Sequence, residues 1–293
     1  MDKNSIDKAE ILSQALPYIQ KYNNKIVVIK YGGNAMINEE LKMNVITDVC
    51  LLAEIGVKVV LVHGGGPEIN RTLHKMGKES KFINGLRYTD EETIDVVQMV
   101  LAGKTNKDLV KLIMQKHGKA IGISGIDGKL IEAEKYMTQD DLGFVGAVKN
   151  IHGDMILDLL DKGYIPVVAS VGMDNEGNTY NINADTAAAE IASELNAENM
   201  ILVSDIPGLL KDKDDENTLL PLVYDEDIQS LKDSHIIGGG MIPKVDCCSR
   251  ALRQNVKKAV IIDGRIPHSI LIEMLSKDGI GTMFVKKGYK EEE

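Results

Sequence analysis

The sequence predicts an α/β protein in which helices cover both faces of a mostly parallel, twisted sheet. Short runs rich in β-branched residues recur along the chain, and segments with apolar residues at every third or fourth position separate them. Glycine loops join several of these runs to the segment that follows. Such an alternation of strands and helices is typical of parallel sheets. The 293 residues suffice for one large unit or for two lobes.

The first strand is expected in KIVVIK, residues 25–30. Its residues 27–29 are β-branched and suit a strand that is covered on both faces. Lys30 then places a charge where the strand leaves the sheet. Gly32 and Gly33 behind it permit a sharp turn, or the close approach of another molecule to the main chain. Taken alone, the run also fits a plain strand, a turn and a solvated lysine.

The remaining elements follow from the same two patterns. A helix is expected over 38–56, then a strand over 57–62, and then a glycine turn that enters a helix within 63–77. Further helices are expected over 90–103, 106–118, 154–163 and 184–196, and further strands over 120–124, 164–171, 199–206 and 258–264.

Residues 1–24 precede the first strand and form an amphipathic helix by their spacing. This helix has no obvious place inside the sandwich, so we expect it to cover an edge or to bind another subunit. Pro17 is expected to bend or end it locally. The rest of the chain is expected to divide near residues 183–197, into a lobe over 25–195 and a lobe over 196–293.

Composition excludes several classes of function. The net charge of −10 argues against general nucleic-acid binding, because little would neutralise a phosphate backbone. No apolar stretch is long enough to cross a bilayer, and the first ten residues lack the pattern of a signal peptide. Three cysteines form no spaced framework. We therefore expect a cytoplasmic protein with no membrane partner and no metal site built from cysteines.

Three familiar motifs are absent on inspection. LAGKT resembles the end of a P-loop, but Gln98 stands where that motif needs a glycine. HGGG at 63–66 resembles an oxyanion loop of hydrolases, yet no serine has the G-x-S-x-G setting that such enzymes require. No G-x-G-x-x-G opens a helix in a first βαβ unit, so dinucleotide binding is poorly supported.

What remains is a set of four glycine loops at predicted strand ends, each beside a polar residue. Ligands of open α/β sheets gather at the carboxyl ends of the strands, where glycine backbones offer N–H groups to anions. Two of the loops carry lysines, which points to an anionic substrate and a nucleotide phosphate tail. The loops are Lys30 with Gly32–Gly33, His63 with Gly64–Gly66, Ser204–Asp205 with Gly208, and GGGMIPK ending in Lys244.

These blocks resemble a known family. IKYGGNAM, VLVHGGGPEIN, NGLRYTD, YNINADTAAAEIA, SDIPGLL and GGGMIPKV are similar, in order and spacing, to the N-acetyl-L-glutamate kinases of the amino acid kinase family. The resemblance covers residues 25–285. It implies a three-layer α/β/α sandwich with an amino-terminal substrate lobe and a carboxy-terminal nucleotide lobe. It also implies phosphorylation of the side-chain carboxylate of N-acetyl-L-glutamate by MgATP, a step of arginine synthesis.

The resemblance assigns the catalytic roles. Lys30 and Lys244 would flank the transferring phosphoryl group, and Asp185 would hold both lysines in place. The attacking carboxylate is already ionised at neutral pH, so it needs no general base. Catalysis would then be mostly positioning and neutralisation of charge.

Binding roles follow from the same resemblance. The N–H groups of Gly65 and Gly66 would hold the carboxylate that is phosphorylated, and Arg87 and Asn181 would bind the α-carboxylate end. Magnesium would arrive on the phosphates of ATP; no protein ligand for it and no tightly bound cofactor is expected. The nucleotide would be bordered by Gly32, Gly33, Ser204, Asp205, Gly208, Leu209 and Lys244.

Ordinary structural roles stay open for some of these residues. Arg87 could form a surface ion pair, and Asp185 or Asn181 could cap a helix. Asn183, to which the resemblance gives no task, is expected to cap one. His63 is expected to pack or hydrogen-bond locally rather than to act in catalysis.

The leading helix resembles the branch of the family that arginine inhibits. In that branch such a helix interlaces dimers into a hexamer, a trimer of dimers. The resemblance places Tyr18, His268, Glu273 and Gly279 near an arginine site, where Glu273 could pair with the guanidinium group. A helix that only joins subunits is the alternative.

Two other functions compete with this interpretation. One is a sister kinase for a related carboxylate such as N-acetyl-aminoadipate. The other is a non-catalytic arginine sensor, which would need none of Lys30, Asp185 and Lys244. A nitrogen-signalling partner protein is possible, but nothing in the sequence supports it.

Overall fold

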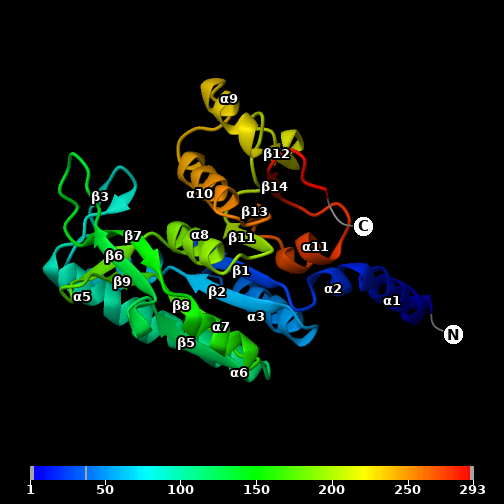
Figure 1. Ribbon diagram of the computed structural model, residues 1–293, viewed down its shortest axis with the longest axis horizontal. Coiled ribbons are helices and arrows are strands. Elements are labelled where there is room, and N and C mark those ends of the chain that lie inside the picture. Colours follow the sequence, from blue (N-terminus) through cyan, green and yellow to red (C-terminus); the bar gives the residue numbers. More distant parts are fainter. Residues whose placement is uncertain (1–2, 37, 291–293) are drawn as a thin grey trace.

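The computed structural model describes residues 3–36 and 38–290, and its centre is one eight-stranded sheet (Figure 1). The strand order is β12-β14-β13-β11-β1-β2-β8-β5, and only the pair β13 and β14 is antiparallel. The predicted α/β class with a mainly parallel sheet is therefore confirmed. Its strands are β1 (Ile26–Tyr31), β2 (Lys58–His63), β5 (Ala120–Ser124), β8 (Ile165–Ala169), β11 (Asn199–Ser204), β12 (Leu222–Tyr224), β13 (Lys258–Asp263) and β14 (Thr282–Val285).

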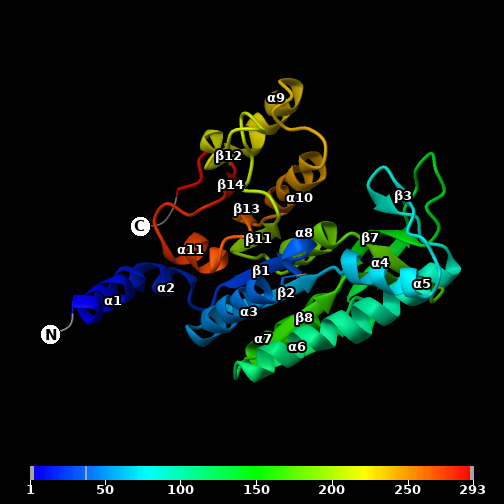
Figure 2. The same cartoon turned by 180° about the vertical axis from the view of Figure 1, so that it is seen from behind.

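Helices cover both faces of this sheet and complete three layers. α7 (Asp154–Asp161), α8 (Ala184–Glu194) and α10 (Met241–Arg253) cover one face (Figure 1). α3 (Glu39–Glu54), α6 (Asn106–Gln115) and α11 (Ser269–Leu275) cover the other (Figure 2). Side chains of a strand point alternately to the two faces. Accordingly Val28 joins the first buried cluster, while Val27 and Ile29 join the second.

The helices expected over 90–103 and 106–118 form one continuous rod. α5 (Glu91–Gln98) runs into a π-helical segment, Met99–Thr105, and that segment runs into α6. The expected break between them was wrong, because Gly103 stays within the helix and Thr105 and Asn106 are buried rather than exposed in a turn. π-helical segments are frequent at functional sites.

A small second sheet stands at the carboxyl-end side of the main sheet, and the sequence did not predict it. Its strands close on themselves, and two of them, residues 171–173 and 179–182, are too short to show the alternation that marks a strand. The strand expected over 164–171 divides at Ser170 between β8 and this small sheet. The strands are β6 (Ile131–Lys135), β7 (Val145–Ile151), β9 (Val171–Met173) and β10 (Thr179–Ile182), with a separate hairpin of β3 (Phe82–Ile83) and β4 (Leu86–Arg87).

The amino-terminal segment forms two helices that extend away from the sheet (Figure 1). α1 (Lys3–Gln14) and α2 (Leu16–Tyr22) are separated at Ala15, and Pro17 lies in the first turn of α2. Pro17 thus marks the expected local break. Leu12 is 72% exposed and Ile11 is 65% exposed. The apolar side chains of α1 therefore stay exposed in the single chain, whereas Ile19 and Tyr22 of α2 are partly or fully buried.

The remaining elements complete the described chain. The main sheet crosses the lobe boundary expected after residue 195, since β1 pairs directly with β11. The division into lobes stays a prediction. Among the described residues, no helix combines the length and the apolar character that crossing a membrane requires. The other helices are α4 (Gly66–Lys75) and α9 (Ile228–Asp233), with 3-10 turns at Gly33–Met36, Asp127–Lys129, Glu216–Thr218 and Asp225–Asp227.

Candidate active site

Two lysines meet one carboxylate at the carboxyl ends of the central strands. The Lys30 Nζ lies 2.8 Å from Asp185 Oδ1, and the Lys244 Nζ lies 3.0 Å from Asp185 Oδ2. The three residues come from β1, α8 and α10, whose sequence positions are far apart. The structure thus brings together the three side chains to which the resemblance assigns catalysis.

The electrostatics of this triad keep Asp185 ionised. Burial by itself raises the pKa of the Asp185 carboxyl, but the charges and hydrogen bonds of Lys30 and Lys244 outweigh it and hold the pKa at about 2. A largely buried carboxylate between two cations stays charged for this reason. The triad leaves one net positive charge at the edge of the sheet.

Local sequence explains how each member reaches this point. Lys30 is the fifth of the six residues of β1, so its side chain emerges at the strand end. Asn183 caps α8 by accepting hydrogen bonds from the N–H groups of Asp185 and Thr186, which fixes Asp185 in the first turn. The expected cap is confirmed. Lys244 lies in the first turn of α10; the glycine run before it follows no strand, so that part of the prediction was wrong.

Glycines form the wall of a cavity of about 280 Å³ beside the triad, hereafter the glycine-loop cavity. It contains eight of the predicted residues, namely Lys30, Gly32, Gly33, Gly65, Gly66, Arg87, Asn181 and Asp185. A Cβ on Gly65 would lie 2.6 Å from Leu101 Cδ2, and one on Gly32 would lie 2.7 Å from the Lys30 Nζ. The main chain therefore approaches its neighbours more closely here than any side chain would allow.

Arg87 projects from the β3–β4 hairpin into this cavity and is 7% exposed. Its Nη1 donates to Ser80 Oγ at 2.7 Å, and its Nη2 donates to the Gly66 carbonyl at 3.3 Å. The ring of Phe82 lies 4.7 Å from the guanidinium carbon. Burial lowers the pKa of Arg87. Because the ordinary pKa of a guanidinium group is very high, the group nevertheless stays charged. The cation is thus held in one orientation and is not part of a surface ion pair.

Asn181 approaches the cavity from β10 of the small sheet. Its Nδ2 donates to Thr89 Oγ1 at 3.3 Å, and its N–H donates to the Phe144 carbonyl. It does not cap a helix. Sequence reasoning missed Ser80, Phe82 and Thr89, which orient Arg87 and Asn181. A short hairpin gives no signal for such contacts, because they join residues that do not share a periodic element.

Of the predicted nucleotide residues, Gly32 and Gly33 line the cavity, and the others lie outside it at the same sheet edge. Ser204 ends β11, which is paired with β1, and its Oγ donates to Asp205 at 3.4 Å. Gly208 has φ +143°, and a Cβ there would lie 2.6 Å from Thr282 Oγ1. The Leu209 N–H donates to that same oxygen, while the Leu209 side chain is buried. Leu209 can therefore border a ligand only through its main chain.

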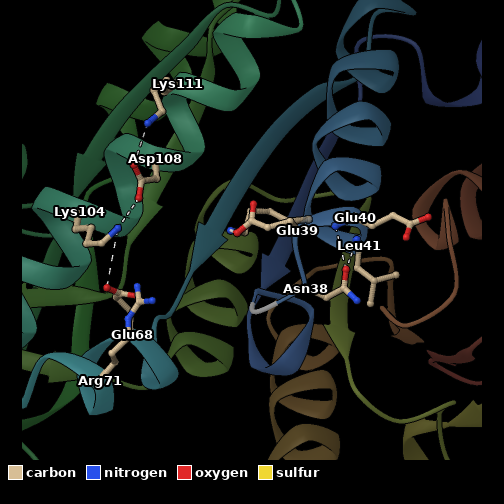
Figure 3. A network of polar contacts seen from close by, with 10 residues as sticks. Asn38, Glu39, Glu40, Leu41, Glu68, Arg71, Lys104, Asp108 and Lys111 are labelled. Atoms are coloured by element: carbon tan, nitrogen blue, oxygen red, sulfur yellow. Dashed lines mark hydrogen bonds and ion pairs between the residues drawn. The ribbon is translucent and has the colours of Figure 1, made fainter. Parts of the chain in front are cut away.

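A further cavity of about 350 Å³ adjoins the glycine loop, and Gly65 and Pro67 line both. Its charged residues pair with one another, as Figure 3 shows for Lys104, Asp108 and Glu68. Three cations face three carboxylates there, so the wall carries no net charge to select an ion. The charged residues are Glu39, Lys42, Glu68, Arg71, Lys104 and Asp108. Within the described part of the chain, no three His, Cys, Asp or Glu side chains are grouped to hold a metal ion.

The residues of the expected arginine site divide into two places. Tyr18, Glu273 and Gly279 line a cavity of about 470 Å³ between α2 and α11, hereafter the α2–α11 cavity. The Glu273 carboxylate, which is 9% exposed, accepts from the Ile280 N–H at 3.0 Å. His268 does not line this cavity. Its Nδ1 lies 2.6 Å from Asp48 Oδ1 on α3, because the chain turns with φ +56° just before α11 begins.

A mainly parallel sandwich with glycine loops, and with two lysines that meet one carboxylate beside the strand ends, is the arrangement of a phosphoryl-transfer enzyme. The model of the amino acid kinase family matches residues 25–263, and the chain belongs to this family. Two of the most similar relatives are acetylglutamate kinases. That of Brachyspira hyodysenteriae is 59% identical over 280 residues, covering 96% of this chain and 97% of that protein. That of Clostridium kluyveri is 53% identical, covering 96% and 99%.

Solved structures share the fold at lower identity. N-acetylglutamate synthase from Neisseria gonorrhoeae, in complex with coenzyme A and N-acetyl-glutamate, has a TM-score of 0.83 at 22% identity. The match covers 96% of this chain and 64% of that one. Giardia carbamate kinase has a TM-score of 0.64 at 16% identity, covering 90% and 99%. These two likenesses concern the fold alone.

Proposed function

We propose that this chain transfers the γ-phosphoryl group of ATP to the side-chain carboxylate of N-acetyl-L-glutamate. The product would be N-acetyl-L-glutamyl 5-phosphate, an intermediate of arginine biosynthesis. Relatives named acetylglutamate kinase support this at 50–59% identity over nearly the whole chain. The observation that carries it is the contact of Lys30 and Lys244 with Asp185 beside a glycine-lined cavity.

The chemistry needs charge rather than a base. One oxygen of the substrate carboxylate forms a bond to the γ-phosphorus while the bond from that phosphorus to the ADP oxygen breaks. The carboxylate is ionised near neutral pH, so no proton has to be removed. Lys30 and Lys244 would neutralise the charge that two approaching anions bring together, and Asp185 would keep both cations at the required spacing. Magnesium would come with the phosphates of ATP.

The substrate would lie in the glycine-loop cavity. The N–H groups of Gly65 and Gly66 would hold the reacting carboxylate. Arg87 would bind the α-carboxylate with its planar fork, and Asn181 would donate its amide to the same end. This arrangement suits a ligand with a carboxylate at each end. It does not by itself select for a particular distance between the two carboxylates.

The nucleotide would lie across the neighbouring strand ends. Gly32 and Gly33 would cover its phosphates, and the segment from Ser204 to Leu209, with Asp205 and Gly208, would border the rest. This assigns acetylglutamate to residues 25–195 and most of the nucleotide to residues 196–293, with Gly32 and Gly33 of the first lobe reaching its phosphates. A cytoplasmic location accords with the metabolic reaction.

Arginine would bind in the α2–α11 cavity as a feedback inhibitor. Glu273 offers a carboxylate for the guanidinium group, and Tyr18 and Gly279 line the same space. His268 is not part of this proposed site, because its imidazole is bound to Asp48. The exposed apolar side chains of α1 support a role in assembly, and the assembly we propose is a hexamer, a trimer of dimers.

The test is an ATP-dependent assay in which hydroxylamine traps the acyl phosphate. We expect turnover with N-acetylglutamate, much lower turnover with N-acetylaminoadipate, and suppression by arginine. Turnover that arginine does not change would remove the inhibitor and keep the kinase. Turnover only with the longer substrate would move the chain to the sister kinases, and binding of arginine without turnover would make it a sensor.

A further inference from the structure

His63 lies directly beneath the glycine loop and takes no part in the chemistry proposed above. It ends β2, it is fully buried, and it does not line the glycine-loop cavity. Its Nδ1 lies 2.9 Å from the carbonyl oxygen of Gly64, and its Nε2 lies 3.1 Å from the Nδ2 of Asn106. Both ring nitrogens therefore have partners within hydrogen-bond distance.

The orientation of the Asn106 amide is fixed by groups that have only one role. Its Nδ2 lies 3.1 Å from the Ile123 carbonyl and 2.8 Å from the Val167 carbonyl, and carbonyls only accept. Its Oδ1 accepts from the Lys107 Nζ at 3.1 Å, and an ammonium only donates. The group that faces the Nε2 of His63 is therefore an NH2 group, whose two hydrogens are shared among three acceptors. A hydrogen on Nε2 would point at this group and find no acceptor, so Nε2 is the unprotonated, accepting nitrogen.

The remaining proton of the imidazole then belongs on Nδ1. Burial lowers the pKa of His63 to about 4, and Lys107 acts in the same direction, so the ring is neutral at physiological pH. A neutral imidazole has one donor and one acceptor nitrogen. With Nε2 accepting from Asn106, the Nδ1–H donates to the Gly64 carbonyl.

This hydrogen bond determines the direction of the next N–H group. The carbonyl of Gly64 and the N–H of Gly65 belong to one planar peptide unit, and in a trans peptide they point in opposite directions. The Gly65 N–H accordingly points away from His63, on the side where the glycine loop lines the cavity. It donates to no acceptor among the residues that the structure describes.

A second contact holds the loop from the other side. Gly65 packs against Leu101 and Thr105, which lie in the π-helical segment. That segment leads directly into Asn106 at the start of α6. One stretch of helix thus supplies both the wall against Gly65 and the donor that sets the protonation of His63.

We propose that His63 is a positioning residue that orients the Gly64–Gly65 peptide, and thereby the N–H donor for the reacting carboxylate, under the control of Asn106. This inference deepens the proposed function and rests on it for the identity of the carboxylate. The histidine does not touch the substrate. Its contribution is to prevent the peptide from turning its carbonyl toward the bound anion.

A matched pair of variants separates this role from simple packing. In His63→Asn the side-chain amide can place a donor where Nδ1 stands, whereas in His63→Leu a methyl group takes that place; both lose the bond to Asn106. We expect His63→Leu to raise KM for N-acetylglutamate by about tenfold or more, because a hydrogen bond to a charged group is weakened. We expect His63→Asn to stay within about threefold of the natural chain, and KM for ATP to stay within about twofold in both. Equal behaviour of the two variants, whether both retain or both lose activity, would overturn the proposal.

A spectroscopic measurement on the unaltered protein needs no variant and no substrate. In ¹⁵N-histidine spectra, the signals of His63 should show a protonated Nδ1 and an unprotonated Nε2 that do not change between about pH 6 and 8. A protonated Nε2 would overturn the proposal, even if the variants do not fold. If the natural chain does not turn over N-acetylglutamate, the proposed function fails, and the ¹⁵N spectrum still decides the peptide orientation.

Discussion

The glycine-loop cavity and the α2–α11 cavity lie at opposite ends of the same strands. Lys30 marks the first, near the carboxyl end of β1, and Tyr22 lines the second, just before β1 begins. The first cavity collects charges and main-chain donors fixed by the central sheet. The second is lined by α2, by the end of α11 and by the segment that follows α11, at the edge of the molecule. We infer that changes in the glycine-loop cavity should alter turnover, whereas changes in the α2–α11 cavity should alter only the inhibition of turnover by arginine.

Removal of one lysine should have the largest effect. Lys30→Met should lower kcat by about 100- to 1,000-fold, because one preorganised charge at the transferring group is worth a few kcal/mol. Lys104→Met is the matched control, since Lys104 is half exposed and pairs with Asp108 at the surface. It should stay within about twofold. Steady-state kinetics that show equal losses for the two variants would contradict the assigned roles.

Crowding the glycine loop should have the next largest effect. In Gly65→Ala the added Cβ would lie 2.6 Å from Leu101 Cδ2 and 3.3 Å from Thr105 Oγ1, so the loop has to shift. Because a small misplacement of reacting groups is costly, kcat/KM for N-acetylglutamate should fall by about 100-fold.

Gly103→Ala is its control, because nothing lies within 4 Å of the corresponding Cβ. We expect unchanged activity and an unchanged or slightly raised melting temperature for this variant. Normal kinetics for Gly65→Ala would show that the loop does not contact the substrate.

The sequence predicted the catalytic end better than the opposite end, and the reason is physical. A β-branched run that ends in Lys30 has to emerge at a sheet edge, and Asn183 has to cap whatever helix follows it. Such local rules do not depend on distant neighbours. Even so, the glycine run before Lys244 follows no strand, because loop composition does not reveal the element that precedes it.

Other positions depend on tertiary contacts that the sequence does not reveal. The resemblance placed His268 near the same arginine site as Glu273; in the structure α11 begins between them, and Asp48 on another helix binds the imidazole. The contacts of Ser80 and Thr89 with the substrate-side residues arise between segments that share no periodicity. The π-helical segment has an ordinary helical sequence.

A smaller effect than those of Lys30→Met and Gly65→Ala is expected when Asp185 of the triad is protonated at low pH, and it should appear in the free energy of unfolding. The folded pKa of Asp185 is about 2, below its usual 3.8, so its stabilisation is present above about pH 4 and is lost as the pH falls toward 2. This amounts to about 2 kcal/mol in the free energy of unfolding. In urea unfolding, the stability difference between the natural chain and Asp185→Asn should narrow by that amount from pH 5 to pH 2. A constant difference would show that the lysines do not stabilise the ionised carboxylate.

The smallest effect is expected at the α2–α11 cavity, and it should appear only in inhibition. Glu273→Gln removes the charge that would pair with arginine, yet its amide oxygen can still accept the N–H of Ile280, so the fold should survive. The arginine concentration for half inhibition should rise about tenfold or more, as for other charged hydrogen bonds, while kcat/KM without arginine stays unchanged. His268→Asn is the matched control on the same helix end, because His268 lies outside the cavity; its arginine response should change by less than about twofold. The reverse pattern would place the inhibitor against His268 and would show that the two ends of the sheet are not separated as the cavities indicate.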